Sequence, residues 1–247
     1  ICAGQSQNLN ASGAASYEWS TSETTNPINV SPASTTVYSV TGTDGNGCTN
    51  TASATVTVNP LPSASILPDP ANVCAGEDLN LDGNPSGGSG TYSTHQWTGD
   101  IASLDDANIQ QPVFNNGSSG SYNLTYTVTD DKGCQNSDNI TVNVNALPTV
   151  SINPAAPSIC LGENQTLTGN GATSYHWSTS ETTTSIDVSP ASNTTYTVTG
   201  TDGIGCTNTA SALVTVNPLP PVAIAPASSE ICAGQSQNLN ASGAASY

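Results

Sequence analysis

Large apolar side chains are scarce in this sequence of 247 residues. It contains one Phe, no Met and three Trp, and hydrophobic residues make up only 35% of it. One large hydrophobic core is therefore excluded, because so little apolar surface would not offset the conformational entropy of a long chain. Several small domains with thin cores fit the composition better. No run of eighteen apolar residues occurs, so no membrane-spanning helix is predicted.

Positive charge is also nearly absent. Lys132 is the single basic residue beside 18 Asp and Glu, and the formal net charge is −17. A cationic surface for DNA or RNA is excluded, and an anionic membrane surface would repel the chain. Low hydrophobicity with high net charge is typical of disorder. Here, however, the apolar residues are regularly patterned and cysteines recur at matched positions, so a folded chain is predicted.

Internal repeats organise the sequence. Residues 1–17 recur without change at 231–247, and about 45 of residues 1–62 are identical in an ungapped alignment with 159–220. Residues 73–148 are a longer, diverged relative. Because the sequence starts without Met or a signal peptide and ends by restarting its own beginning, we expect a piece of a longer, periodic, exported polypeptide.

Short proline-containing segments separate the repeats. N-P-L-P occurs at 59–62 and 217–220, and N-A-L-P at 145–148. Proline removes a ladder donor, so these segments mark strand ends and stiff linkers. The predicted domains are 1–62, which lacks its first strand; 63–148, which is longer and diverged; 149–220; and 221–247, the start of a further domain.

Strand alternation dominates, and helical periodicity is absent. Tyr38 and Val40 fall on one face of a strand and Val37 on the other, and the turn 44–47 is rich in Gly, Asn and Asp. The strand after this turn alternates Ala and Val with Thr and Ser, which predicts a hairpin with an apolar inner face and a hydroxyl outer face. The fold class predicted is all-β, with tandem immunoglobulin-like β-sandwich domains arranged as an extended rod.

Aromatic residues two apart recur on one strand of each domain. An aromatic platform for a ligand is one interpretation. The interpretation we favour is core packing of the tryptophan against a disulfide, as in known sandwiches. The residues concerned are Tyr17, Trp19, Trp97, Tyr175 and Trp177.

Each complete domain holds one cysteine in an [IV]-C-x-G context and one in a G-C context, which indicates disulfides. Zinc is disfavoured because no domain offers four close ligands. The pairing we predict lies within domains, and the partner of Cys232 lies outside the sequence. An alternative stays open, in which Cys2 joins Cys134 across a domain junction. The predicted pairs are Cys2–Cys48, Cys74–Cys134 and Cys160–Cys206.

The combined pattern, C-x-G, then Y-x-W-S-T-x-E-T-T, then G-T-D-G-x-G-C, resembles a known group. It is similar to the immunoglobulin-like and PKD-like repeats of giant surface adhesins of gliding bacteria that use type IX secretion, including the repeats of the gliding-motility adhesin SprB. The resemblance implies a stalk or adhesin at the cell surface. Residues 63–148 depart from the pattern, since they lack the S-T-S-E-T-T block and carry an insertion.

Catalytic and metal motifs are weak. No nucleophile–base constellation, phosphate loop or zinc motif is present, so no enzyme activity is predicted. Calcium is the one cofactor worth weighing, since acidic residues on Gly-rich loops supply oxygen ligands, but no full ligand set is readable. The candidate residues are Asp44, Asn46, Asp130, Asp131 and Asp202.

The function predicted is a structural spacer in an extracellular surface adhesin or fibre. Its partners are neighbouring repeats of the same chain and, in a fibre, other copies. Two alternatives remain: a module that binds glycan or another cell directly, for which regular outer Thr rows are the only hint, and an accessory stalk of a secreted hydrolase. Near-identity of residues 1–62 and 159–220 favours the spacer, because recognition surfaces lie mostly on divergent loops.

Overall fold

The computed structural model describes residues 1–246. Nearly all regular structure in this range is β-strand, and the only helical turn within it is the 3-10 segment η1 (Ile101–Ser103). The predicted all-β class is therefore confirmed. Within the same range, no helix is long and apolar enough to cross a membrane.

The chain divides into two compact units. Unit 1 is Ile1–Ala146, and unit 2 begins at Leu147. The division lies inside the predicted linker at 145–148. Unit 1 contains two separate hydrophobic clusters and unit 2 contains one, here termed the first, second and third cores in chain order. The other domain boundaries and the rod arrangement stay predictions.

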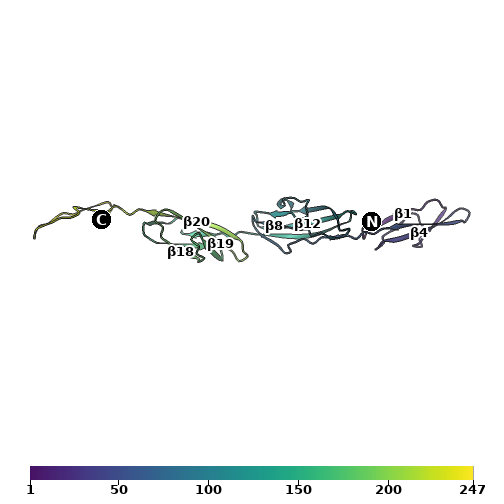
Figure 1. Ribbon diagram of the computed structural model, residues 1–247, viewed down its shortest axis with the longest axis horizontal. Helices are drawn as coiled ribbons and strands as arrows, with labels where there is room; N and C mark the ends of the chain where they lie inside the picture. The colour runs from purple at the N-terminus through teal and green to yellow at the C-terminus, as the bar shows by residue number, and fades with distance from the viewer. Residues whose placement is uncertain (247) are drawn as a thin grey trace. The chain divides into compact units, whose positions relative to one another are not determined.

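The third core is a complete sandwich of seven strands (Figure 1). One sheet has the order β14-β16-β18 and the other the order β15-β20-β19-β17. These orders correspond to the A-B-E and A′-G-F-C sheets of an immunoglobulin-like domain, so the fold predicted from the sequence is confirmed. The strands are β14 (Ser151–Asn153), β15 (Ser158–Cys160), β16 (Gln165–Asn170), β17 (Ser174–Trp177), β18 (Ser185–Val188), β19 (Thr194–Thr201) and β20 (Thr207–Asn217).

The β19–β20 hairpin shows why the alternating sequence forms this fold. Tyr196 pairs with Ala212 and Val198 with Ala210, and these inward side chains close one side of the core. The hydroxyl residues between them face outward, where Thr197 and Ser211 hydrogen-bond across the strands at 2.8 Å. The predicted hairpin and its two faces are therefore confirmed.

The first core has the same plan with five strands instead of seven, and the isolated bridge between Cys2 and Asn59 stands where β15 pairs in the third core. Its sheets have the orders β1-β3 and β2-β4-β5, and Tyr38 pairs with Ala54 in the hairpin as Tyr196 does with Ala212. The described residues include no counterpart of β14 in this core. Its strands are β1 (Gln7–Leu9), β2 (Ser16–Trp19), β3 (Ile28–Val30), β4 (Thr36–Thr43) and β5 (Thr49–Val56).

The second core is larger, and its principal sheet has the order β10-β12-β13-β7. β11 pairs with β8, and β6 pairs with β9. Figure 1 labels β8 and β12 within this core. Its strands are β6 (Pro62–Ser63), β7 (Ala71–Cys74), β8 (Asp78–Asn80), β9 (Ser86–Gly87), β10 (Tyr92–Gly99), β11 (Val113–Asn115), β12 (Gly120–Asp130) and β13 (Gln135–Asn145).

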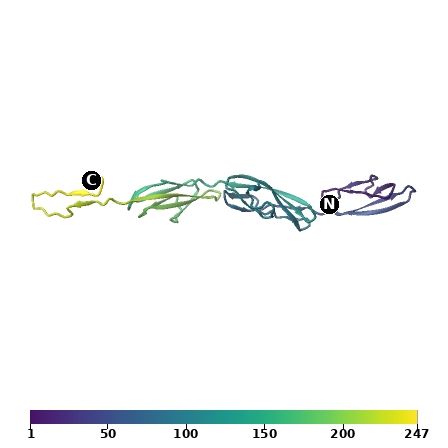
Figure 2. The ribbon, with the colours of Figure 1, turned by 90° about the horizontal axis from the view of Figure 1, so that it is seen from above.

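The last part of unit 2 forms a hairpin, drawn in yellow in Figure 2. Its two short strands, β21 (Ala223–Ala225) and β22 (Asn240–Ser242), pair in antiparallel fashion. All of their residues are exposed, so this hairpin has no core of its own within the described chain.

Candidate functional site

A disulfide joins Cys2 to Cys134, with 5.5 Å between their Cα atoms. Cys2 bridges to Asn59 at the end of the first sandwich, and Cys134 follows the turn between β12 and β13 in the second. Cys134 is fully buried. The bond therefore connects two successive cores covalently. Cys74 and Cys206 are disulfide-bonded as well.

The predicted pairing within domains is wrong. Within the described range, Cys48 and Cys160 carry free, exposed thiols, as does Cys232. Cys2 bridges to Asn59, eleven residues beyond Cys48 along a strand that rises about 3.3 Å per residue. The two cysteines thus lie at opposite ends of the sandwich, whereas a disulfide needs Cα atoms within about 7 Å.

The same geometry excludes the other two predicted pairs. β7 and β15 run parallel to the last strand of their sandwiches, so Cys74 lies opposite Asn145 and Cys160 opposite Asn217. Each of these asparagines is again eleven residues beyond the turn cysteine of its own sandwich. The alternative left open by the sequence, Cys2 with Cys134, is the pairing in the structure.

An aspartate four residues before each turn cysteine shapes the turn that presents it. The Oδ1 atoms of Asp44, Asp130 and Asp202 accept from the backbone N–H of the cysteine at 2.9 Å in all three turns. The same oxygen also accepts from the N–H two residues after the aspartate. The N–H of Cys48 is the main cause that holds the pKa of Asp44 below its usual value.

The sequence named these aspartates only as weak calcium candidates in ordinary turns, and their hydrogen bonds to the cysteine N–H were not predicted. The signal was the D-x-x-x-C spacing in all three turns. Asp130 is buried, and its second oxygen accepts from the Ser89 N–H at 3.1 Å, so both oxygens are hydrogen-bonded. Asn46 is exposed, and Asp131 binds Lys132 at 3.2 Å. No group of three or more His, Cys, Asp or Glu in residues 1–246 is placed to hold a metal ion.

The predicted core tryptophans lie in the cores. Trp19, Trp97 and Trp177 are each at most 5% exposed. Each indole N–H donates to a backbone carbonyl. The acceptor is the carbonyl of Thr25 for Trp19, of Ile109 for Trp97 and of Thr183 for Trp177. No cysteine belongs to any of the three clusters among the described residues. The expected packing of tryptophan on a disulfide is therefore wrong, because the disulfide lies at the end of the sandwich.

The predicted aromatic neighbours Tyr17 and Tyr175 anchor the loop before their own strand. The Tyr17 hydroxyl donates to the Ala14 carbonyl at 3.1 Å and accepts from the Ala14 N–H at 3.0 Å. Tyr175 makes the same two bonds with Ala172. These tyrosines have a structural role, and each is half-buried.

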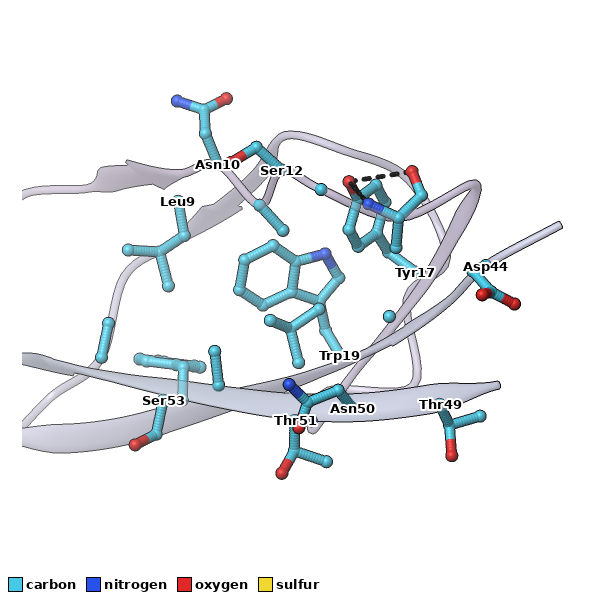
Figure 3. A pocket seen from close by; sticks show the side chains of 18 of the residues that line it. Leu9, Asn10, Ser12, Tyr17, Trp19, Asp44, Thr49, Asn50, Thr51 and Ser53 are labelled. Atoms are coloured by element: carbon cyan, nitrogen blue, oxygen red, sulfur yellow. Dashed lines mark hydrogen bonds between the residues drawn. The ribbon is translucent and has the colours of Figure 1, made fainter. Parts of the chain in front are cut away.

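A cavity of about 560 Å³ opens beside the first core (Figure 3). Its floor is the Trp19 indole, its rim includes Leu9, Asn10 and Ser12, and β5 forms its far wall. The cavity exposes part of β5 to solvent. Ala54 on this strand is exposed, whereas the equivalent Ala212 in the third core is only 1% exposed.

The comparisons with known proteins agree with this architecture. A family model described as K319L-like, PKD domain matches residues 71–144, which span β7 to β13 almost completely. No curated protein sequence matches the chain.

Several solved structures are similar to the chain. The titin fragment I67–I69, as an E-to-A variant, is 16% identical, with 87% of this chain and 94% of that chain covered and a TM-score of 0.40. Sidekick-1 immunoglobulin domains 1–5 are 14% identical, with 83% and 52% covered and a TM-score of 0.33. A nucleoside hydrolase-related hypothetical protein from Saccharophagus degradans is 17% identical, with 35% and 26% covered and a TM-score of 0.31.

This chain spans about half of the Sidekick-1 chain and about a quarter of the Saccharophagus one. The sheet orders and the matched segment together describe a multi-domain sandwich protein of immunoglobulin-like type, in which residues 71–144 match a PKD domain.

Proposed function

We propose that this chain is a structural, load-bearing segment of a secreted cell-surface adhesin or extracellular fibre, and that it catalyses no reaction. The observation that carries the proposal is the Cys2–Cys134 disulfide, which ties one core to the next instead of closing a loop inside one core. A staple of this kind is of little use to an isolated domain. It strengthens the connection along a series of domains.

The position of the bond fits a role under tension. A pulling force that enters at Ile1 reaches Cys2 at once, crosses the disulfide to Cys134 and leaves along β13. The residues between the two cysteines, 3–133, lie outside this covalent path. The first core is thereby shielded from forced unfolding, which for non-covalent structure is governed by the unfolding rate. The second core carries load through β13, which contributes Ile140, Val142 and Val144 to it.

The surface and the thiol chemistry support an extracellular location. Disulfides persist in oxidising compartments, and the strong negative charge keeps neighbouring chains soluble. The finer attribution, to surface adhesins of gliding bacteria exported by type IX secretion, rests on the sequence resemblance of residues 17–25 and 40–48.

Electron microscopy of the native protein tests the proposal. Antibody raised against residues 71–144 is applied to producing cells before and after mild reduction. We expect label at intervals along surface fibres, and fibres that break under shear only after reduction. Label confined to fibre tips would favour the adhesive module instead, and label restricted to the cell interior would contradict the proposal.

A further inference from the structure

Lys132 is the single basic side chain among the 247 residues of the sequence. It lies in the turn between β12 and β13 of the second core, and its side chain is 54% exposed. Endopeptidases of the trypsin class accept a lysine or arginine side chain in an acidic pocket and cleave the peptide bond that follows it. The sequence therefore offers such an enzyme one site, the Lys132–Gly133 bond.

Hydrogen bonds within the turn close the backbone around this site. The Asp130 N–H donates to the Cys134 carbonyl at 2.9 Å, and the Gly133 N–H donates to the Asp130 carbonyl at 3.0 Å. The N–H groups of Lys132 and Cys134 donate to Asp130 Oδ1 at 3.0 Å and 2.9 Å. A protease binds the segment around the scissile bond in an extended form, so the turn must open before cleavage.

A neighbouring loop holds the turn from outside. Residues 84–91, here termed the insertion loop, belong to the insertion that distinguishes this repeat from the other two. The Thr91 carbonyl accepts from the Asp131 N–H at 3.0 Å, and the Ser89 N–H donates to Asp130 Oδ2 at 3.1 Å. Asp130 is only 1% exposed, so water competes little for the second of these bonds. The insertion loop thus adds two hydrogen bonds to those that the turn makes within itself.

The insertion loop is itself anchored on the other side. Pro62 pairs with Gly87 between β6 and β9, and the Tyr92 hydroxyl donates to the Gly87 carbonyl at 3.2 Å. A Cβ atom on Gly88 would lie 2.8 Å from Asp130 Oδ2 and 3.0 Å from the Pro62 nitrogen. The loop is therefore packed tightly between the segment that enters the second core and the turn that carries the lysine.

The corresponding turn of the third core, residues 202–206, provides a matched comparison. Its aspartate accepts the same two N–H groups as Asp130 does. The connection from β16 to β17, residues 171–173, reaches only Thr201, whose carbonyl accepts from the residue 173 N–H at 2.9 Å. In the described part of the chain, no hydrogen bond joins this connection to residues 202–205. The turn that has the additional bonds is thus the one that contains the lysine.

The disulfide determines what a cut at this site would do. Lys132 lies between Cys2 and Cys134, which are joined. Hydrolysis adds one water molecule across the Lys132–Gly133 bond, leaves a carboxylate on Lys132 and an amino group on Gly133, and breaks no other bond. The residues before the cut stay joined to those after it through the two sulfur atoms. A cut here therefore leaves the covalent path from Ile1 to β13 intact.

We propose that Lys132–Gly133 is a cleavage site for trypsin-like endopeptidases that the insertion loop keeps closed, and that the Cys2–Cys134 disulfide holds the chain together once this site is cut. The lysine thus lies where cleavage is slow and where a cut does not separate the two parts of the chain. This protection serves any chain that meets such enzymes, and it does not depend on the load-bearing role.

Copying the site into the third core tests the role of the loop. Gly203→Asp with Ile204→Lys gives both turns the sequence Asp-Asp-Lys-Gly-Cys. Both positions have room, because a Cβ atom on Gly203 would meet nothing within 4 Å and Ile204 is 66% exposed. The folded full chain is digested with trypsin, and the fragments are followed by mass spectrometry. We expect cleavage after position 204 to be roughly tenfold faster than after Lys132, because only the turn around Lys132 has the two additional hydrogen bonds.

Two controls accompany this digestion. In the unfolded, reduced and alkylated chain the two identical sites should be cut at equal rates. Gly88→Val, added to the same chain, should push the insertion loop away from Asp130 and speed cleavage after Lys132 without changing the rate at position 204; circular dichroism checks that this variant folds. A position 204 that is cut no faster than Lys132 overturns the proposal, and so does a rate at Lys132 that Gly88→Val leaves unchanged.

The role of the disulfide is tested on the full chain with Cys74→Ser, which removes the other disulfide-bonded cysteine that precedes the cut. Free thiols are alkylated, and trypsin then cuts the chain in urea without reductant. Residues 1–132 and 133–247 should migrate as one species on a gel until reductant is added. Pieces that separate without reductant overturn this part of the proposal.

Discussion

Stretching unit 1 between its ends is a quantitative test of the domain-to-domain disulfide. Residues 1–146 are held by handles at both termini, and the remaining thiols are alkylated. The bond spans 132 residues, whereas its Cα atoms are 5.5 Å apart. An extended chain reaches about 3.5 Å per residue, so reduction should release ~460 Å of contour length.

With the bond intact, only the short stretch after Cys134 should extend, by ~40 Å. Optical tweezers resolve this difference when reductant is added during a constant-force experiment. Pairing within domains predicts different steps, because Cys2–Cys48 and Cys74–Cys134 would enclose 46 and 60 residues, or ~160 Å and ~210 Å. Steps of those two lengths, or no step on reduction, would refute the reasoning.

Three further outcomes follow from the described contacts. Trp177→Ala should lower the free energy of unfolding of the third core by about 3–5 kcal/mol in urea, because it empties a buried site and leaves the Thr183 carbonyl without its donor. The control is His176→Ala at the exposed neighbouring residue, which should change the free energy of unfolding little. A calcium chelator should leave the thermal midpoint unchanged, since the turn aspartates already accept two backbone N–H groups each; a fall of many degrees would show that these loops bind metal. Burial is the main cause that raises the pKa of Tyr126 from 10.0 to about 12, and the charge of Asp82 adds to it. The tyrosine of the unfolded state therefore ionises at lower pH than that of the folded state, so the second core should lose stability as the pH rises from 10 toward 12. Phenolate absorbance together with circular dichroism measures this loss.

Much of the fold could be predicted from local pattern. The alternation in β4 and β5 set the inner face of the hairpin, and the aromatic pairs located the strand that carries each core tryptophan. Both signals depend only on the two-residue periodicity of side chains along a strand, and the sequence of one repeat is enough to show it. The missing first strand of the first core was also recognisable, because an intact version stands at 149–154.

The cysteine pairing could not be read in the same way. Sequence spacing counts residues between cysteines, but β5 carries the chain from one end of the sandwich to the other between Cys48 and Asn59. Only the topology shows that Cys2 lies at the Asn59 end. With this pairing no disulfide lies inside a core, so apolar burial must stabilise each core on its own.

The role of the turn aspartates was missed for a related reason. Asp, Asn and Gly occur both in loops that bind a cation and in tight turns. The sequence does not show in which direction the carboxylate oxygens point. In the structure the Oδ1 atom of Asp130 turns inward to the N–H groups of Lys132 and Cys134. The fixed distance from aspartate to cysteine was the feature that distinguishes these two uses.

Peptide mapping of the native chain under non-reducing conditions tests the central claim most directly. Thiols are blocked at low pH before digestion, so that no exchange occurs, and linked peptides are identified by mass spectrometry. The account predicts a peptide in which Cys2 is joined to Cys134. A peptide in which Cys2 is joined to Cys48 would contradict it.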